Sequence, residues 1–337
     1  RRSARPPPRC GSVREPAGVP PAAVTMRRTT PLSVGILMGL SGGATLAGEA
    51  LGARALRPLL GSTALAQTGT LVGVLGALGL GAWWAGRQRR WGFRAVLVGA
   101  HAGLALVAVL GALAPRVLTD PFARALVALS LRAPAAGDVA RLVLAVALTA
   151  APGFLAGASY PAAVSLLRRG AGPGTALVGA TSSLGAALAA LATTFAFGPT
   201  LGVSRTLLAA AGIYALLAAA ASFFEDTPRA PVGLTPAAPV DRSALATLCL
   251  LGAASTAWQV LVARVGALSF GPSAFTFATA LAGHVTALAF GELLALPYVT
   301  RCSREAARRA LGGVTFAAAL AAALAAPLLR ALPSFAE

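Results

Sequence analysis

Two acidic residues, Glu49 and Glu292, fall inside long apolar stretches of the sequence. A charge within a bilayer is costly, so an acidic residue in a membrane span usually marks the path of a substrate, an ion or a proton. The alternative is structural, because a carboxylate near a helix end can reach the interface or pair with a base. Glu49 could pair in this way with Arg54, although five residues is not the ideal spacing for neighbours on a helix. Both interpretations stay open for both acids.

The sequence also contains an internal repeat. Residues 42–54 resemble residues 252–264, and the match continues without a gap until Gly81 meets Gly291. The first copy begins at the first apolar stretch and the second at the seventh, so one unit would hold six helices. An even number of spans per unit gives a parallel repeat, as in transporters with two like-oriented halves. The second unit stops after its third helix.

The repeat adds three polar candidates to the two acids. Gln259 replaces Glu49 in the second copy, which keeps hydrogen bonding and loses the charge. Arg54 and Arg264 occupy equivalent positions, where they either contact a substrate between the repeats or stabilise a helix C-terminus. The candidate substrate-binding residues are therefore Glu49, Arg54, Gln259, Arg264 and Glu292.

No other residue pattern predicts catalysis or metal binding. Cys10, Cys249 and Cys302 lack metal-ligand spacing and contain no C-x-x-C pair. His101 and His284 each stand inside an apolar stretch without a partner at metal spacing, which is more typical of a hydrogen-bonded structural histidine. We expect no catalytic residue, no metal and no cofactor in this chain.

The composition sets the class of protein that must position these residues. Of the 337 residues, 57% are hydrophobic and only 11% are charged, whereas soluble proteins carry about 25% charged residues. The net charge of +18 could suit a nucleic-acid binder. However, the arginines form short clusters between apolar runs, as the positive-inside rule predicts for membrane proteins. We therefore expect an all-α polytopic membrane protein with the lipid bilayer as its partner and no nucleic acid.

A helix needs about 20 apolar residues to cross a bilayer, and the sequence offers about nine such spans. Pro152 and Pro161 are expected to bend the fourth of them. The nine predicted spans cover 32–53, 64–85, 95–113, 142–167, 176–197, 206–224, 245–268, 275–299 and 310–329.

Arginine clusters follow the second, fourth and eighth predicted spans, in residues 87–94, 168–169 and 301–309. Placing all three inside also places Arg27 and Arg28 inside, which gives one consistent topology. The N-terminus is then cytoplasmic, and the protein is predicted to span the bacterial inner membrane. Residues 116–141 form an external connection in this topology, which is mixed in charge and is a candidate for an interfacial helix.

Four regions follow from this pattern. Residues 1–29 are basic and rich in proline and are predicted to be disordered, with Met26 as a candidate true start. Residues 30–224 form the first six-helix membrane unit. Residues 225–243 form a cytoplasmic linker, and residues 244–337 form a partial second repeat of three helices.

Several short segments resemble one family. These are Gly42-Gly43-Ala44 followed by Glu49 and Arg54, then Gly61-Ser62, Leu78-Gly79-Leu80-Gly81, Gly157-Ala158-Ser159-Tyr160-Pro161, residues 179–185 and Pro199-Thr200-Leu201-Gly202. Together they resemble the membrane domain of bacterial spermidine synthase-like proteins, which are homologues of polyamine aminopropyltransferases. The resemblance implies a membrane module that anchors a synthase or conducts a small substrate, with a separate or fused synthase domain as partner.

The sequence departs from that family in one respect. It contains no Gly-rich loop for an aminopropyl donor, no acidic cluster for a polyamine and no βαβ pattern, so the resemblance does not imply an aminopropyltransferase active site in these residues. The alternative is a stand-alone secondary transporter similar to the major facilitator superfamily. The six-helix repeat favours it, although residues 81–90 lack the aspartate of that superfamily's usual loop motif.

Overall fold

The computed structural model describes residues 30–60, 64–88, 90–167, 171–226, 242–271, 274–301 and 304–331. The regular structure within these residues is entirely helical. The elements are α1 (Pro31–Leu60), α2 (Ala64–Arg87), α3 (Phe93–Arg132), α4 (Pro134–Leu166), α5 (Ala171–Ala192), the π-helical η1 (Thr193–Phe197), α6 (Gly198–Ser222), α7 (Arg242–Phe270), α8 (Ala274–Arg301) and α9 (Arg304–Ala331).

Eight helical stretches of the described chain are long and apolar enough to cross a membrane. This confirms the predicted all-helical class, and the length and apolar composition of the helices support a membrane protein. The count is one lower than the nine predicted spans because the fifth and sixth fall in a single stretch, Gly172–Ser222, which runs through α5, η1 and α6. The predicted disordered segment 1–29 and the linker residues 227–241 lie outside the described residues.

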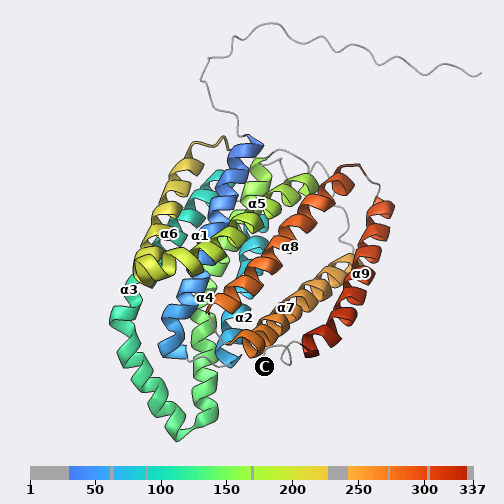
Figure 1. The fold of residues 1–337 in the computed structure, drawn as a ribbon. Helices are drawn as coiled ribbons and strands as arrows, with labels where there is room; N and C mark the ends of the chain where they lie inside the picture. Colours follow the sequence, from blue (N-terminus) through green and yellow to red (C-terminus); the bar gives the residue numbers. More distant parts are fainter. Residues whose placement is uncertain are drawn as a thin grey trace, which may run out of the picture.

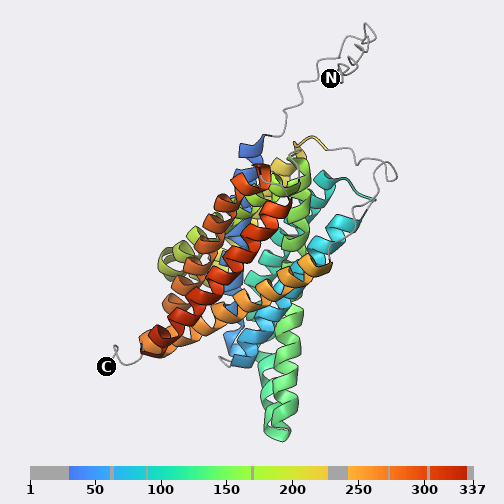
Figure 2. The same ribbon diagram turned by 90° about the vertical axis from the view of Figure 1, so that its right-hand side faces the viewer.

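The helices pack as one bundle with α1 in its middle (Figure 1). α1 packs along α5 and also contacts α3, α4 and α6, while α2 packs on α4 and α3 packs on α6. α8 lies against α5, and α7 in turn packs on α8. Figure 2 shows α7, α8 and α9 together on one side of the bundle. The first six helices therefore enclose an interior, to which α8 adds a further layer.

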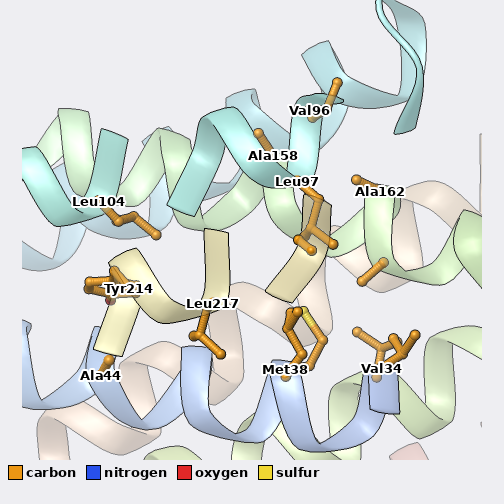
Figure 3. Close-up of a cluster of buried hydrophobic side chains, with 14 of the residues drawn as sticks. Val34, Met38, Ala44, Val96, Leu97, Leu104, Ala158, Ala162, Tyr214 and Leu217 are labelled. Atoms are coloured by element: carbon orange, nitrogen blue, oxygen red, sulfur yellow. The ribbon is translucent and has the colours of Figure 1, made fainter. Parts of the chain in front are cut away.

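Small and aliphatic side chains fill the contact between α1, α3 and α6. Val34 and Leu97 are fully buried there. Figure 3 shows Met38 of α1 and Leu217 of α6 in the same layer, with Tyr214 beside Ala44. Many large apolar side chains instead point outward, as expected when lipid tails rather than water surround the helices.

Glycines allow α2 and α4 to approach each other closely. A Cβ atom added at Gly157 of α4 would lie 2.7 Å from the Cα atom of Leu78 on α2, and one added at Gly153 would lie 2.6 Å from the carbonyl oxygen of Val74. In the other direction, a Cβ at Gly81 of α2 would collide with the backbone of Phe154. Small residues at a contact let helix backbones approach in membranes, so these glycines set the α2–α4 distance.

Three pairs of glycines at G-x-x-x-G spacing, which allows helices to pack closely, differ in their surroundings. Gly39 and Gly43 lie against the backbone of α5, and Gly69 and Gly73 lie against α4. The pair formed by Gly48 and Gly52 faces open space. Two of these three pairs thus lie at a close helix contact, because the spacing alone does not show which helix face meets a neighbour.

Residues 116–141, predicted to connect the third and fourth spans, are helical, but they extend α3 and α4 and do not form a separate interfacial helix. α3 continues without interruption to Arg132, and α4 begins at Pro134, so the two helices form a long hairpin with Ala133 at its turn. A helix of 40 residues is about 60 Å long, twice the apolar thickness of a bilayer. The hairpin projects beyond the rest of the bundle in both views (Figures 1 and 2). Its many alanines and leucines favour helix, which explains why the helices do not stop at the end of the apolar span.

At the other end of α3, an aspartate from a distant segment caps the helix. The backbone N–H of Arg94 donates a hydrogen bond to Asp226, which follows α6, at 3.3 Å. The carboxylate of Asp226 lies directly against Gly92, the residue before α3, where a side chain would have no room. A carboxylate at a helix N-terminus satisfies free N–H groups and complements the helix dipole.

Candidate functional site

One face of α1 carries a line of polar side chains in the bundle interior. Ser41, Thr45 and Glu49 follow one another at intervals of four residues, which places them on the same face of the helix. Ser41 is buried, with 2% of its surface exposed, and Thr45 and Glu49 are partly buried. Glu49, singled out from the sequence as one of two acids in an apolar span, is thus the last member of a polar line.

α3 contributes a fully buried histidine to this line. The Nε2 atom of His101 lies 3.0 Å from the Oγ atom of Ser41, and its Nδ1 atom lies 2.8 Å from the carbonyl oxygen of Leu97, one turn earlier on α3. None of the His101 surface is exposed. Hydrogen bonds at both ring nitrogens fit the structural interpretation that the sequence favoured for this histidine.

α6 contributes a buried tyrosine on the other side. The hydroxyl groups of Tyr214 and Thr45 are 2.8 Å apart, and the Thr45 hydroxyl also donates to the carbonyl oxygen of Ser41 at 2.8 Å. The phenol of Tyr214 is close enough to the Glu49 carboxyl for an electrostatic interaction between them. The rings of Tyr214 and His101 are also neighbours, with centroids 6.2 Å apart.

These five residues form one cluster, which we call the α1 polar cluster: Ser41, Thr45, Glu49, His101 and Tyr214. Its members come from α1, α3 and α6, so the contact between these three helices brings them together. It holds one carboxyl group among hydrogen-bonding neighbours that are neutral in their usual states. Such a carboxyl can hold a proton or a bound cation.

Glu292 lies at a different place, where α8 packs on α5. Its carboxyl group is hydrogen-bonded to Ser183 and lies directly against Gly179, both on α5. Tyr160 of α4 faces the same carboxyl, and its own hydroxyl donates to the carbonyl oxygen of Thr175 at 2.9 Å. The Oε2 atom of Glu292 is buried and has no hydrogen-bond partner among the described residues. The absence of a side chain at Gly179 leaves room for this carboxyl.

The structure separates Arg54 from the acid with which it could have paired. The Arg54 side chain is exposed, and its Nη1 atom lies near Gly198 at the start of α6. No ion pair joins Arg54 to Glu49 within the part of the chain that the structure describes. Among the described residues, the predicted pairing of Glu49 with Arg54 is therefore not formed.

The two candidates from the second repeat lie on α7. Gln259 is partly buried and Arg264 is exposed. Neither forms a hydrogen bond or an ion pair with another described residue, and α7 packs mainly on α8. The structure thus shows no interaction that joins these residues to the α1 polar cluster.

The described residues contain no group of three histidines, cysteines or acids that could hold a metal ion. Cys249 is exposed, whereas Cys10 and Cys302 lie outside the described residues. His284 is partly buried on α8.

Sequence reasoning did not identify Ser41, Thr45, Tyr214 or Ser183 as neighbours of the two acids. For α1 a local signal was present, because a serine, a threonine and a glutamate at four-residue spacing predict a polar face on a helix. No local signal pointed to Tyr214, since it is 169 residues from Thr45.

Comparison with protein-family models, with curated proteins and with solved structures finds no match to this chain.

Proposed function

We propose that this chain is the integral membrane module of a spermidine synthase-like protein, and that it conducts a small cationic substrate. The module lies in the bacterial inner membrane with its N-terminus in the cytoplasm, and it has no aminopropyltransferase site of its own. The segments around Glu49, Leu78 and Tyr160 that resemble the family support this proposal, together with the charge that the buried site can offer.

The observation that carries the proposal is the position of Glu49 in the α1 polar cluster. A carboxyl group buried away from water is expensive unless a proton, a cation or a metal neutralises it. Glu49 has no basic partner among the described residues. A membrane anchor needs only apolar helices, so a buried acid of this kind favours conduction over anchoring. Ammonium groups of a polyamine are suitable counter-ions for it.

Glu292 provides a second acid for the same path. Its buried Oε2 atom has no hydrogen-bond partner in the described residues, and it lies on the contact between the first six helices and α8. A polyamine carries more than one ammonium group, so two separated carboxyl groups suit a chain-like cation that passes between them. Glu292 is the weaker of the two candidates, because Ser183 already neighbours its carboxyl group.

Uptake of labelled spermidine into proteoliposomes tests this function. We expect the wild-type protein to accumulate spermidine and Glu49→Gln to lose most of that uptake, since the amide keeps the size and hydrogen bonding of the side chain without its charge. The matched control is Glu305→Gln on α9, where the side chain is exposed and paired with Arg309. Equal uptake by Glu49→Gln and wild type would remove Glu49 from the mechanism.

A specific observation favours a second candidate, a stand-alone secondary transporter built from two like-oriented units. The sequence repeat aligns at an offset of 210 residues. At this offset α1 corresponds to α7, α2 to α8 and α3 to α9. The second helix of each pair begins within one residue of the position that the offset predicts from the first. This agreement supports a partial parallel repeat, similar to the major facilitator architecture. Uptake of amino acids or sugars, in a preparation that does not take up spermidine, would favour this candidate.

A further inference from the structure

The hydrogen bonds of the α1 polar cluster have a direction that the donors and acceptors fix. A carbonyl oxygen only accepts, so the Nδ1 atom of His101 carries a proton and donates it to Leu97. In a neutral imidazole the Nε2 atom then accepts, which makes the Ser41 hydroxyl its donor. The single proton of the Thr45 hydroxyl goes to the carbonyl oxygen of Ser41. Tyr214 must therefore donate to Thr45.

This pattern leaves the Glu49 carboxyl without a donor from the other four members of the cluster. Every hydroxyl and ring N–H of the other four residues has an acceptor. The phenol of Tyr214 is the group of α6 that faces Glu49. A negatively charged Glu49 carboxylate would attract the Tyr214 hydroxyl away from Thr45. A change in the charge of Glu49 would then alter a hydrogen bond between α1 and α6.

Among the side chains that the structure describes on the neighbouring helices, no fixed cation compensates Glu49. α5 and η1 contain no titratable residue at all. Tyr160 of α4 faces Glu292 instead, and Arg54 on α1 itself is exposed beside Gly198. The titratable groups that α3 and α6 contribute to the cluster are His101 and Tyr214. The charged residues whose side chains the structure describes on α3, α4 and α6 lie toward the helix ends or in the α3–α4 hairpin: Arg94, Asp120, Arg124, Arg132, Asp138, Arg141 and Arg205.

We propose that Glu49 is a proton-exchange site, at which a proton and a substrate ammonium group replace each other. The inference rests on the proposed conduction of a cation and adds its coupling ion. With no substrate bound, the Glu49 carboxyl holds the proton and is neutral. When an ammonium group arrives, the O–H bond of the carboxyl breaks and its proton is transferred to water on the side from which the substrate enters. The resulting carboxylate becomes the counter-ion of the ammonium group. One positive charge enters and one leaves, so the buried site stays neutral in both states.

Infrared difference spectroscopy on the full chain in lipid vesicles tests the proton directly. At neutral pH and without substrate, we expect a C=O stretching band of a protonated carboxyl group that is lost in Glu49→Gln and kept in Glu305→Gln. A second variant, Tyr214→Phe, keeps the carboxyl and should shift the frequency of this band, because it removes the phenol that faces it. A wild-type spectrum whose protonated-carboxyl signal is unchanged by Glu49→Gln would overturn the proposal.

Proton release measured with a pH dye in weakly buffered solution tests the exchange. Adding spermidine should release about one proton per bound ammonium at this site, and Glu49→Gln should release none. Spermidine binding without proton release from the wild type would also overturn the proposal. If the protonated Glu49 band is present but spermidine neither binds nor is transported, the polyamine function fails while the proton site stands, so the two failures are distinguishable.

Discussion

Ser41 and His101 lie 60 residues apart in the sequence and share a hydrogen bond of 3.0 Å between two buried side chains. The bond joins α1 to α3 in the middle of the first six-helix unit. Because the carbonyl oxygen of Leu97 accepts from Nδ1, the Nε2 atom of the neutral ring is the acceptor in this bond and the Ser41 hydroxyl is its donor.

Removing the Ser41 hydroxyl should leave the Nε2 atom of His101 buried without a partner. We expect Ser41→Ala to destabilise the protein by about 1–3 kcal/mol, the usual cost of an orphaned buried polar group. The double variant Ser41→Ala with His101→Leu should lose less than the sum of the two single variants, because it removes both partners. Thermal unfolding in detergent, followed by tryptophan fluorescence, measures this. The control Ser222→Ala, which removes an exposed hydroxyl, should change the free energy of unfolding by less than about 0.5 kcal/mol. If the effects of Ser41→Ala and His101→Leu simply add in the double variant, the two side chains are not coupled.

Nuclear magnetic resonance can show which ring nitrogen of His101 carries the proton, because the sequence has only two histidines. In a His284→Gln background, ¹⁵N-labelled histidine reports His101 alone. We expect the neutral form with the proton on Nδ1 at neutral pH, as the Leu97 carbonyl requires. A proton on Nε2 instead of Nδ1, or an imidazolium with protons on both nitrogens, would contradict the assigned directions of the hydrogen bonds.

The contact between α2 and α4 should not tolerate a side chain at Gly157. A Cβ atom there would press on the backbone of Leu78, which cannot move as a side-chain end can. We expect Gly157→Ala to cost about 1–3 kcal/mol, as other overpacked cores do, and to lower the unfolding temperature. Gly76→Ala on α2 is the matched control, since Gly76 faces open space and alanine favours helix by about 0.5–1 kcal/mol. An equal response of the two variants would show that this approach of the helices is not tight.

Asp226, in the segment after α6, caps the N-terminus of α3 and should therefore stabilise the folded membrane unit. Losing an N-cap side chain costs about 0.5–2 kcal/mol, so Asp226→Ala should lower the unfolding temperature. Asp120→Ala, which removes the same charge from an exposed position in the α3–α4 hairpin, should have a much smaller effect. If both substitutions act alike, the effect is one of net charge rather than of capping.

The predicted topology places the turn of the α3–α4 hairpin outside and the segment between α2 and α3 inside. Arg132 and Arg90 are both exposed and make a matched pair for cysteine substitution after the three native cysteines are replaced by serine. A membrane-impermeant maleimide added to intact cells should label Arg132→Cys and leave Arg90→Cys unlabelled until the membrane is opened. The reverse pattern would invert the assigned orientation.

The sequence by itself determined the class of this protein and most of its helices. Runs of about 20 apolar residues are a local property, and a bilayer leaves few other ways to satisfy the backbone than a helix. The same local reasoning made Glu49 and Glu292 conspicuous, because any acid in such a run is costly. It did not show that residues 116–141 continue α3 and α4 beyond the apolar spans, since helix propensity does not end where hydrophobicity does.

Only the tertiary structure decided which groups surround the two acids. Tyr214 reaches Thr45 from 169 residues away, and His101 reaches Ser41 from another helix. These meetings depend on the angles and distances at which α1, α3 and α6 pack, which are set by many weak contacts spread along the chain. Those contacts cannot be predicted from the type of a residue and its position along one helix. The sequence could therefore show that Glu49 falls inside an apolar stretch, and the packing of three helices showed what it faces there.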